Sequence, residues 1–434
     1  MAKSNNGLQQ WVRLAPKPRK LTGEDKWNVF LSYRSVNRTW VLNLYDVLRG
    51  LGHEVFLDQV VLPGGSLLIR SLEGALAASQ SGILIWTSAT QDSEWVRREY
   101  EVLERQASEK PGFRFVPVRL DNSRLPPFAS SRIFLDFSSY PDGPNGGELL
   151  RLVHAIVGQP LSTKALHFAN DQDEAAMVAS ASIGTSIKNK RPKRLIQLWN
   201  ENGLPWRTSS VLGCKVAEGL TRLDQNEKAI RILVELENRF PRAIRPKQLR
   251  ALALARRGKP GDLDKAQEIL GLLYEQGERD PETLGIYART WMDRYEASRD
   301  LSDLERSRDH YADAFARAPD DYYTGINAAA KSVFLGTPKD LKRAAQYAQQ
   351  VQKIVGTKSH PDDYWKTATV GEAFLIQRKY KDAARLYASA VATARSEEGS
   401  HRATWKQARR LMAKLQPTKQ EREMIGKAFQ HLKD

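Results

Sequence analysis

The sequence predicts two parts of different fold class: an α/β domain built on a parallel sheet, followed by an all-α solenoid of helical repeats. From Asp25 to Gly158, short apolar runs alternate with amphipathic stretches of helical length, which is typical of strands and helices that alternate along a chain. From Arg207 onward, helical patterns recur at a regular period. The chain has 434 residues, more than one hydrophobic core usually supports, which agrees with two or more domains.

Five apolar runs predict the strands of the first part, namely Trp27–Tyr33, His53–Asp58, Gly82–Thr87, Phe113–Leu120 and Ile133–Phe137. Helical periodicity predicts helices between and after these runs, namely Arg38–Gly50, Leu67–Ala78, a helix that starts near Ser93, and Glu148–Val157. Strands that alternate with helices in this way form a parallel sheet that is covered on both faces.

Glu99 lies on the apolar face of the helix that follows the third strand. Val96, Val102 and Leu103 share that face, and Trp95 stands at its edge, four residues before Glu99. A carboxylate among apolar neighbours costs free energy unless a partner or a reaction uses it. Glu99 is therefore a candidate functional residue.

Several polar residues are predicted at one edge of this sheet. Tyr33, Arg34, Asp58 and Ser88 fall at or just after the ends of predicted strands, and the helix of Glu99 starts shortly after the third strand. In parallel sheets, ligands bind outside the carboxyl ends of the strands. We therefore expect these residues to line a common site.

Composition excludes some classes of protein and leaves one question open. The single cysteine, Cys214, excludes an intramolecular disulfide framework and a cysteine-based zinc site. We see neither a membrane-spanning apolar stretch nor a signal peptide, and expect a cytoplasmic protein. The formal charge of +16 is partly concentrated in Met1–Lys20 and Lys188–Arg194. These clusters could bind an anionic partner, but without a nucleic-acid-binding motif we favour a solvated arm and a solvated linker.

Four segments, in order and suitably spaced, resemble the Toll/interleukin-1 receptor (TIR) domain. They are Val29-Phe30-Leu31-Ser32-Tyr33-Arg34, Val55-Phe56-Leu57-Asp58, Leu62-Pro63-Gly64-Gly65 and Ser93-x-Trp95-x-x-x-Glu99. The resemblance covers about Asp25 to Gly158. It implies a flavodoxin-like fold with a five-stranded parallel sheet.

The resemblance also implies roles for individual residues. In TIR domains that cleave NAD, the glutamate four residues after this tryptophan is catalytic, which implies that role for Glu99. It further implies that Tyr33, Arg34, Asp58 and Trp95 line the substrate pocket. Some NAD-cleaving relatives have a lysine shortly after the aspartate, where this chain has Val60-Val61, so the resemblance does not imply that contact.

A loop at the position of Pro63, Gly64 and Gly65 contacts a neighbouring domain in related TIR enzymes, which implies self-association of this chain. The glycine-rich signatures of phosphate-binding loops are absent from this stretch. We therefore expect the loop to serve in assembly.

A lone carboxylate suits the cleavage of NAD. The nicotinamide of NAD is cationic and leaves as a neutral molecule, so the general acid of ordinary glycosidases is not required. The remaining oxocarbenium-like ribose can be stabilised by one carboxylate, while Arg34 could pair with the pyrophosphate. On this interpretation NAD+ is the substrate, and no metal or further cofactor is needed.

Other interpretations of these residues stay open. Glu99 could pair with Arg34 or Arg119 in a TIR domain that only binds proteins. Trp95 could belong to the core, and Tyr33 and Asp58 could be strand-end packing and a turn former.

The second part contains a helical repeat with small residues at matching positions. Aligned second helices place Ala229, Ala266, Ser307, Ala344 and Ala383 at separations of 37, 41, 37 and 39 residues. The clearest unit, from Trp365 to Ala390, resembles tetratricopeptide repeats, and the stretch from Tyr322 to Ala329 resembles the regulatory region of apoptosis-signalling kinases. Because the period exceeds the usual length of roughly 34 residues, we expect long loops such as Gly258–Asp262.

The domain boundaries that we expect are a basic flexible arm (1–24), a TIR domain (25–158), a linker with helical segments (159–206), repeats (207–415) and a capping helix (416–434). By resemblance, the chain is an NAD+ hydrolase of a bacterial immune or cell-death response. An unknown protein or ligand acts on its repeats, and it oligomerises. A non-enzymatic scaffold and an NAD cyclase are the alternatives. We expect neither membrane nor nucleic-acid partners.

Overall fold

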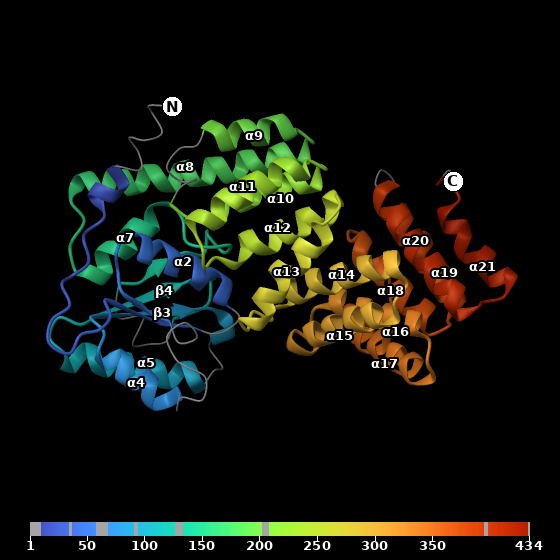
Figure 1. Ribbon diagram of the computed structural model, residues 1–434, viewed down its shortest axis with the longest axis horizontal. Coiled ribbons are helices and arrows are strands. Elements are labelled where there is room, and N and C mark those ends of the chain that lie inside the picture. Colours follow the sequence, from blue (N-terminus) through green and yellow to red (C-terminus); the bar gives the residue numbers. More distant parts are fainter. Residues whose placement is uncertain are drawn as a thin grey trace. The chain divides into compact units, whose positions relative to one another are not determined.

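The computed structural model describes residues 10–33, 37–57, 68–90, 94–125, 133–201, 208–394 and 398–432, and within these ranges it leaves the side chains of residues 68–72, 89 and 94–100 undescribed. The chain divides into two compact units, Met1–Arg257 and Gly258–Asp434 (Figure 1).

Unit 1 contains the predicted parallel sheet. Within the described residues its strands are β1 (Val29–Ser32), β2 (Val55–Phe56), β3 (Ser81–Trp86), β4 (Arg114–Arg119) and β5 (Leu135–Asp136). All neighbouring strands are parallel, and their order is β2-β1-β3-β4-β5. This order is that of the flavodoxin-like fold and confirms the predicted fold class.

Helices cover both faces of this sheet, as predicted for parallel strands. Helices α4 (Leu68–Ala77) and α5 (Glu94–Glu109) lie on one face, and α2 (Arg38–Gly50) and α7 (Gly146–Val157) lie on the other (Figure 1). Leu31, Ile83 and Leu84 of the strands are almost completely buried, because a strand with helices on both sides has no solvent-facing side.

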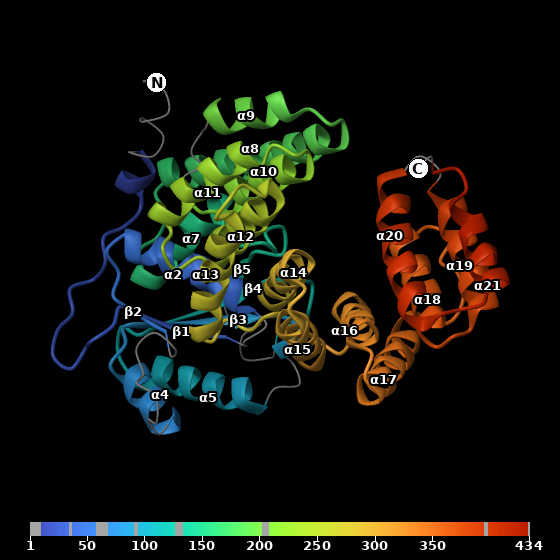
Figure 2. The same ribbon diagram turned by 45° about the vertical axis from the view of Figure 1, so that its right-hand side comes forward.

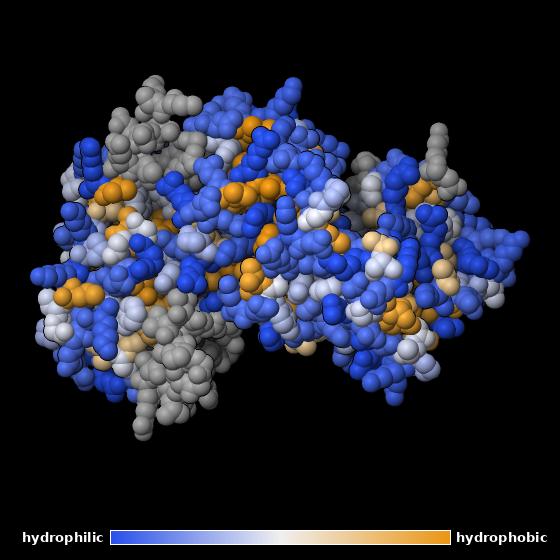
Figure 3. All heavy atoms as spheres, in the orientation of Figure 1, coloured by the Kyte–Doolittle hydropathy of each residue, from blue (hydrophilic) through white to orange (hydrophobic). Residues whose placement is uncertain are grey.

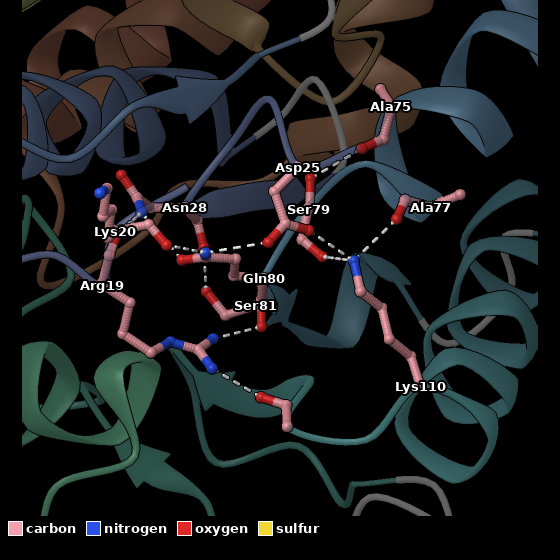
Figure 4. A network of polar contacts seen from close by, with 11 residues as sticks. Arg19, Lys20, Asp25, Asn28, Ala75, Ala77, Ser79, Gln80, Ser81 and Lys110 are labelled. Carbon is pink, nitrogen blue, oxygen red and sulfur yellow. Dashed lines mark hydrogen bonds and ion pairs between the residues drawn. The ribbon is translucent and has the colours of Figure 1, made fainter. Parts of the chain in front are cut away.

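The amino ends of the strands are closed by residues 10–24, which were expected to form a flexible arm. The guanidinium of Arg19 donates hydrogen bonds to the carbonyls of Gln80 (2.6 Å) and Gly112 (2.7 Å). Gln80 in turn donates to the carbonyl of Lys20 and to Asp25. Figure 4 shows this network. The described part of the segment is therefore fixed to the domain.

Asn28 joins this network to the first strand. Its amide nitrogen donates to the carbonyl of Arg19 (2.8 Å) and to the side chain of Gln80 (2.9 Å), and its oxygen accepts from the backbone nitrogen of Glu54 (2.9 Å). Lys110 closes the other side of the network through Asp25 (Figure 4). The buried amide groups of Asn28 and Gln80 therefore have partners within the chain.

The residues after α7 form helices that continue unit 1. They are α8 (Thr163–Lys188), α9 (Pro192–Glu201), α10 (Val211–Arg222), α11 (Asn226–Arg239) and α12 (Ile244–Arg257). Helix α8 runs along α7 (Figure 1). The approach is so close that a Cβ on Gly147 would lie 2.0 Å from the carbonyl oxygen of Ala169.

Unit 2 consists of helices in the described residues. They are α13 (Asp262–Glu275), α14 (Pro281–Ser298), α15 (Leu301–Arg317), α16 (Tyr322–Leu335), α17 (Pro338–Val355), α18 (Tyr364–Ile376), α19 (Tyr380–Thr393), α20 (Glu398–Leu415), α21 (Lys419–Gly426) and the short η4 (Lys427–Phe429). From α13 to α19, each helix packs on the next one along the chain, as expected of a tetratricopeptide-like solenoid.

The predicted small positions of the repeats are buried between helices. Ala229, Ala266, Ala344 and Ala383 are at most 1% exposed. Ser307 is also fully buried, and its hydroxyl donates to the carbonyl of Ala288 (2.7 Å), which explains why a serine is tolerated there.

The long repeat period comes from the helices and not from the loops that we expected. The stretch Gly258–Asp262 is a short connection between α12 and α13, whereas α14, α15 and α17 have 17 or 18 residues each.

On the face seen in Figure 3, apolar residues of unit 2 form small separate patches among hydrophilic side chains. Among the described helices, none is both long and apolar enough to cross a membrane.

Candidate functional site

Polar side chains gather at the carboxyl edge of the sheet, where the sequence predicts a site. Tyr33 follows β1 directly and is half-buried, and the guanidinium of Arg38 donates a hydrogen bond to its hydroxyl (3.0 Å). Asn37 donates to the hydroxyl of Thr87 (3.3 Å), which links the start of α2 to the end of β3. Tyr33 therefore lies on the predicted edge.

The turn after β3 is built from hydroxyl groups and one carboxylate. The backbone nitrogen of Thr87 donates to the hydroxyl of Thr90 (2.9 Å) within η2 (Ser88–Thr90). The backbone nitrogen of Ser88 donates to Asp121 (2.7 Å), which follows β4 and also accepts from the backbone of Ser123 (2.9 Å). Asp121 thus ties the ends of β3 and β4 together, and Ser88 lies exposed beside it.

Asp121 remains ionised at this edge. Burial opposes its ionisation, but hydrogen bonds from Ser123 and Ser88 outweigh burial and lower the pKa of Asp121. A fixed negative charge consequently lies at the carboxyl edge of β4.

Arg119 and Asp136 form an ion pair between the ends of β4 and β5. Their nitrogen and oxygen are 2.5 Å apart, and the guanidinium also lies 4.9 Å from the ring centre of Phe134. Burial opposes ionisation of Asp136, but Arg119 and Ser138 outweigh it and lower the pKa of Asp136. The alternative in which Arg119 also pairs with Glu99 stays a prediction, because the side chain of Glu99 is not among the described ones.

Helix α5 confirms the predicted helix of Glu99, which lies in its second turn. The structure describes the backbone of Glu99 and Trp95 but not their side chains, and Arg34, Asp58, Pro63, Gly64 and Gly65 lie outside the described residues. The roles inferred for these residues stay predictions.

Sequence reasoning missed three polar residues at this edge: Asn37, Arg38 and Asp121. Asp121 carries the signal that was used for Asp58, since it comes directly after a predicted strand. Asn37 and Arg38 lie at the start of α2, and nothing in the helical pattern distinguishes them from ordinary solvent-exposed residues.

Away from this edge, a buried polar contact joins α2 to the helices that follow the α/β domain. Asp46 is 7% exposed, and one of its oxygens accepts from the backbone nitrogens of Arg242 (2.8 Å) and Ala243 (2.7 Å). These nitrogens immediately precede α12, so Asp46 satisfies donors at the start of a helix that lies far along the chain. Desolvation raises the pKa of Asp46 to about 6, although these hydrogen bonds oppose the rise.

Further polar contacts reinforce this connection. Lys215 of α10 pairs with Asp142 (2.9 Å), and Asp173 of α8 accepts from the backbone nitrogen of Gly147 (2.6 Å) and from Arg151 (2.8 Å). The helices after the α/β domain are therefore attached to α2 and α7 by charged groups.

Comparisons with known proteins match both parts of the chain. The family model described as TIR domain matches residues 29–151, and the model described as Tetratricopeptide Repeats-Sensor matches residues 217–333. Nothing among the curated proteins matches the chain.

Solved structures of tetratricopeptide proteins are similar to it at low identity. A thermophilic TPR protein of Thermus thermophilus has 15% identity over 47% of this chain and 98% of its own, with a TM-score of 0.36. Yeast Tom70 has 13% identity over 99% of this chain and 74% of its own, with a TM-score of 0.39. At these scores the two likenesses carry no argument about function. The family matches and the observed strand order show the domain composition: the chain joins a TIR domain to repeats of the tetratricopeptide sensor type.

Proposed function

We propose that this chain is an NAD+ hydrolase whose TIR domain releases nicotinamide and whose repeats regulate it through oligomerisation. The proposal rests mainly on the TIR match together with the position of Glu99, on the helix that follows β3. In this fold, that position belongs to the edge where ligands bind.

The proposed reaction needs few protein groups. The bond between the ribose C1′ and the nicotinamide nitrogen breaks, and its electron pair neutralises the cationic ring. Water adds to C1′ and loses a proton, which gives ADP-ribose. The carboxylate of Glu99 would stabilise the positive charge that develops on the ribose.

Other residues of the edge suit a nucleotide with ribose hydroxyls and a pyrophosphate. Tyr33 offers an aromatic ring whose hydroxyl is held by Arg38, and Ser88 offers an exposed hydroxyl. Arg34, Asp58 and Trp95 complete the proposed substrate-binding set. NAD+ is the substrate, and the reaction requires no further cofactor.

The proposed biological role is that of an effector in a bacterial immune or cell-death response in the cytoplasm. Pro63, Gly64 and Gly65 would contact a neighbouring TIR domain, and a protein or ligand trigger would act on the repeats. Attachment of the first repeat helices to α2 supports this coupling, because Asp46 connects the TIR domain directly to the start of α12.

The test is incubation of purified full-length protein with NAD+ over a wide range of protein concentration, with and without a crowding agent. Nicotinamide and the second product are identified by mass. We expect nicotinamide and ADP-ribose, with specific activity that rises with concentration.

Other outcomes separate the alternatives. A product lighter than ADP-ribose by one water identifies a cyclase, because an internal nucleophile has then replaced water. NAD+ that stays intact under every condition would reject the enzyme and favour a scaffold that only binds proteins.

A further inference from the structure

Helix α20 departs from the packing order of the repeats. In the earlier pairs, each second helix packs on the next first helix, as α15 does on α16 and α17 on α18. Helix α20 instead packs mainly on α16 and α18, while α21 packs on α19. In Figure 2, α20 lies on one side of α18, and α19 and α21 lie on the other. We call the surface formed by α14, α16 and α18 beneath α20 the inner face.

Apolar residues seat α20 on this face. Ala408, Leu411, Met412 and Leu415 are buried in the main core of unit 2, whereas Lys414, near the end of the helix, is exposed. The helix is therefore amphipathic, and its apolar stripe is covered.

Polar contacts fix the register of α20. Arg410 pairs with Glu296 of α14 (2.7 Å). Gln407 donates to Glu372 of α18 (2.9 Å), and Tyr364 of α18 donates to Thr404 (2.8 Å). Helix α20 thus contacts two of the first helices, α14 and α18, through polar side chains.

The inner face is more charged than a permanent core contact requires. Burial raises the pKa of Glu372 and of Asp293, and it lowers the pKa of Lys331 to about 8. The ammonium of Lys331 donates to Asn327 (2.7 Å) and lies 5.1 Å from the ring centre of Tyr311. Burying charges costs free energy that apolar residues of similar volume would avoid. Such a face suits a surface that also exists uncovered.

The charge of α20 complements that of the face. The helix contains five Lys or Arg residues and one acidic residue, Glu398. The inner face presents three carboxyl groups from two helices, those of Asp293, Glu296 and Glu372, against the ammonium of Lys331. The arrangement therefore selects a basic helix with an apolar stripe.

We propose that the inner face is a docking site for a basic amphipathic helix of a partner protein, and that α20 is a built-in occupant which the partner helix displaces. This proposal deepens the regulatory half of the proposed function and rests on it. Its test measures binding without NAD turnover, so the two can fail separately.

The probe is a fluorescent peptide with the sequence of residues 398–415, and its binding to full-length chains is measured by anisotropy. Wild-type protein should bind weakly, because apparent affinity falls with the fraction of chains whose face is open. Arg410→Glu places a carboxylate opposite Glu296, so we expect about tenfold tighter peptide binding, from repulsion of the chain's own α20. Lys414→Glu makes the same charge change on an exposed position and should behave as wild type.

A reciprocal variant controls for misfolding and for specificity. Glu296→Arg should also open the face, but should prefer a peptide that carries Arg410→Glu. The double variant Arg410→Glu with Glu296→Arg should close again and bind neither peptide well. Amide exchange of α20 should accelerate in both single variants. The proposal would be overturned if neither single variant bound the peptide more tightly than Lys414→Glu does. It would also be overturned if both single variants unfolded, because α20 would then be a permanent part of the core.

Discussion

The two ends of the parallel sheet are both polar, but their polar groups are engaged differently. At the amino end, Asn28 and Gln80 are almost buried and form hydrogen bonds with residues 10–24. At the carboxyl end, Tyr33 and Asp121 are half-buried and Ser88 is exposed, although local hydrogen bonds hold them in place. One end is completed by the chain itself, and the other leaves these described polar side chains partly or fully exposed.

This difference separates stability from chemistry. Buried hydrogen-bonded groups with partners from distant segments contribute to folding, because loss of one partner leaves the others unsatisfied. Partly exposed groups held by turns contribute little to stability and retain capacity for binding. Substitutions at the amino end should therefore act on the free energy of unfolding, and those at the carboxyl end on turnover.

The largest expected effect is at Glu99. Glu99→Gln keeps the volume of the side chain but removes the charge that would stabilise the developing cation, so we expect nicotinamide release to fall by a factor of about 10² to 10³ with an unchanged melting temperature. Glu101→Gln is the matched control, since Glu101 is an exposed residue on the same helix. Turnover equal to wild type in folded Glu99→Gln protein would contradict the catalytic assignment.

Asn28→Ala should produce the opposite result at the amino end. It removes hydrogen bonds to Arg19, Gln80 and Glu54. We therefore expect the free energy of unfolding to fall by about 2–4 kcal/mol. Turnover per folded molecule should stay unchanged. Denaturant unfolding and nicotinamide release measure the two quantities. Asn122→Ala, at an exposed position near the carboxyl end, should change stability by less than about 0.5 kcal/mol. An Asn28→Ala protein as stable as wild type would contradict the stabilising role that we assign to this network.

Asp46 extends the comparison to the side of the domain. Its pKa rises from 3.8 to about 6 on folding, so between these values the folded state binds more protons than the unfolded state. Its contribution to stability is present below the lower value and is lost as the pH rises through about 6.

Between pH 5 and pH 7, we expect the unfolding free energy of wild type to fall by about 1 kcal/mol relative to that of Asp46→Asn. Chemical denaturation at each pH measures this difference. A difference independent of pH would show that Asp46 is not the titrating group.

The smallest expected effect belongs to Asp121. Asp121→Asn retains one acceptor for the amides of Ser88 and Ser123 but loses the charge. We expect kcat/KM to fall by about threefold, mainly through a rise in KM, with a stability loss of less than about 1 kcal/mol. Steady-state kinetics and thermal melting measure both. A change in stability without a change in KM would place Asp121 with the structural residues of the amino end.

The sequence was sufficient for those elements that have a strong local pattern. The predicted bounds of α2, Arg38–Gly50, agree with the structure, because the apolar residues of this helix repeat at helical spacing and glycine follows them. Among the described residues, β2 is shorter than its apolar run, since its pairs with β1 are formed by Val55 and Phe56. An apolar run indicates which residues are buried, and buried residues extend beyond those that form the hydrogen-bonded strand pair.

Contacts between distant segments could not be predicted in this way. Residues 10–24 have a basic, proline-containing sequence that resembles a solvated arm, yet Arg19 bonds to the carbonyl of Gly112, 93 residues away. Asp46 finds its partner Arg242 after 196 residues. A backbone carbonyl or amide gives no sequence signal as a partner, so neither contact could be inferred without the fold.

The contact between Asp46 and the start of α12 also determines where the chain can be divided. A fragment that ends at Gly158 would expose the carboxylate of Asp46 and the side chain of Asn43, both of which are buried in unit 1. A fragment that ends at Arg257 would keep them covered, since it contains the whole of the first compact unit. A recombinant TIR domain, or a chimera that grafts it onto another sensor, should therefore carry α8 to α12 with it. The exchangeable module is larger than the matched TIR region.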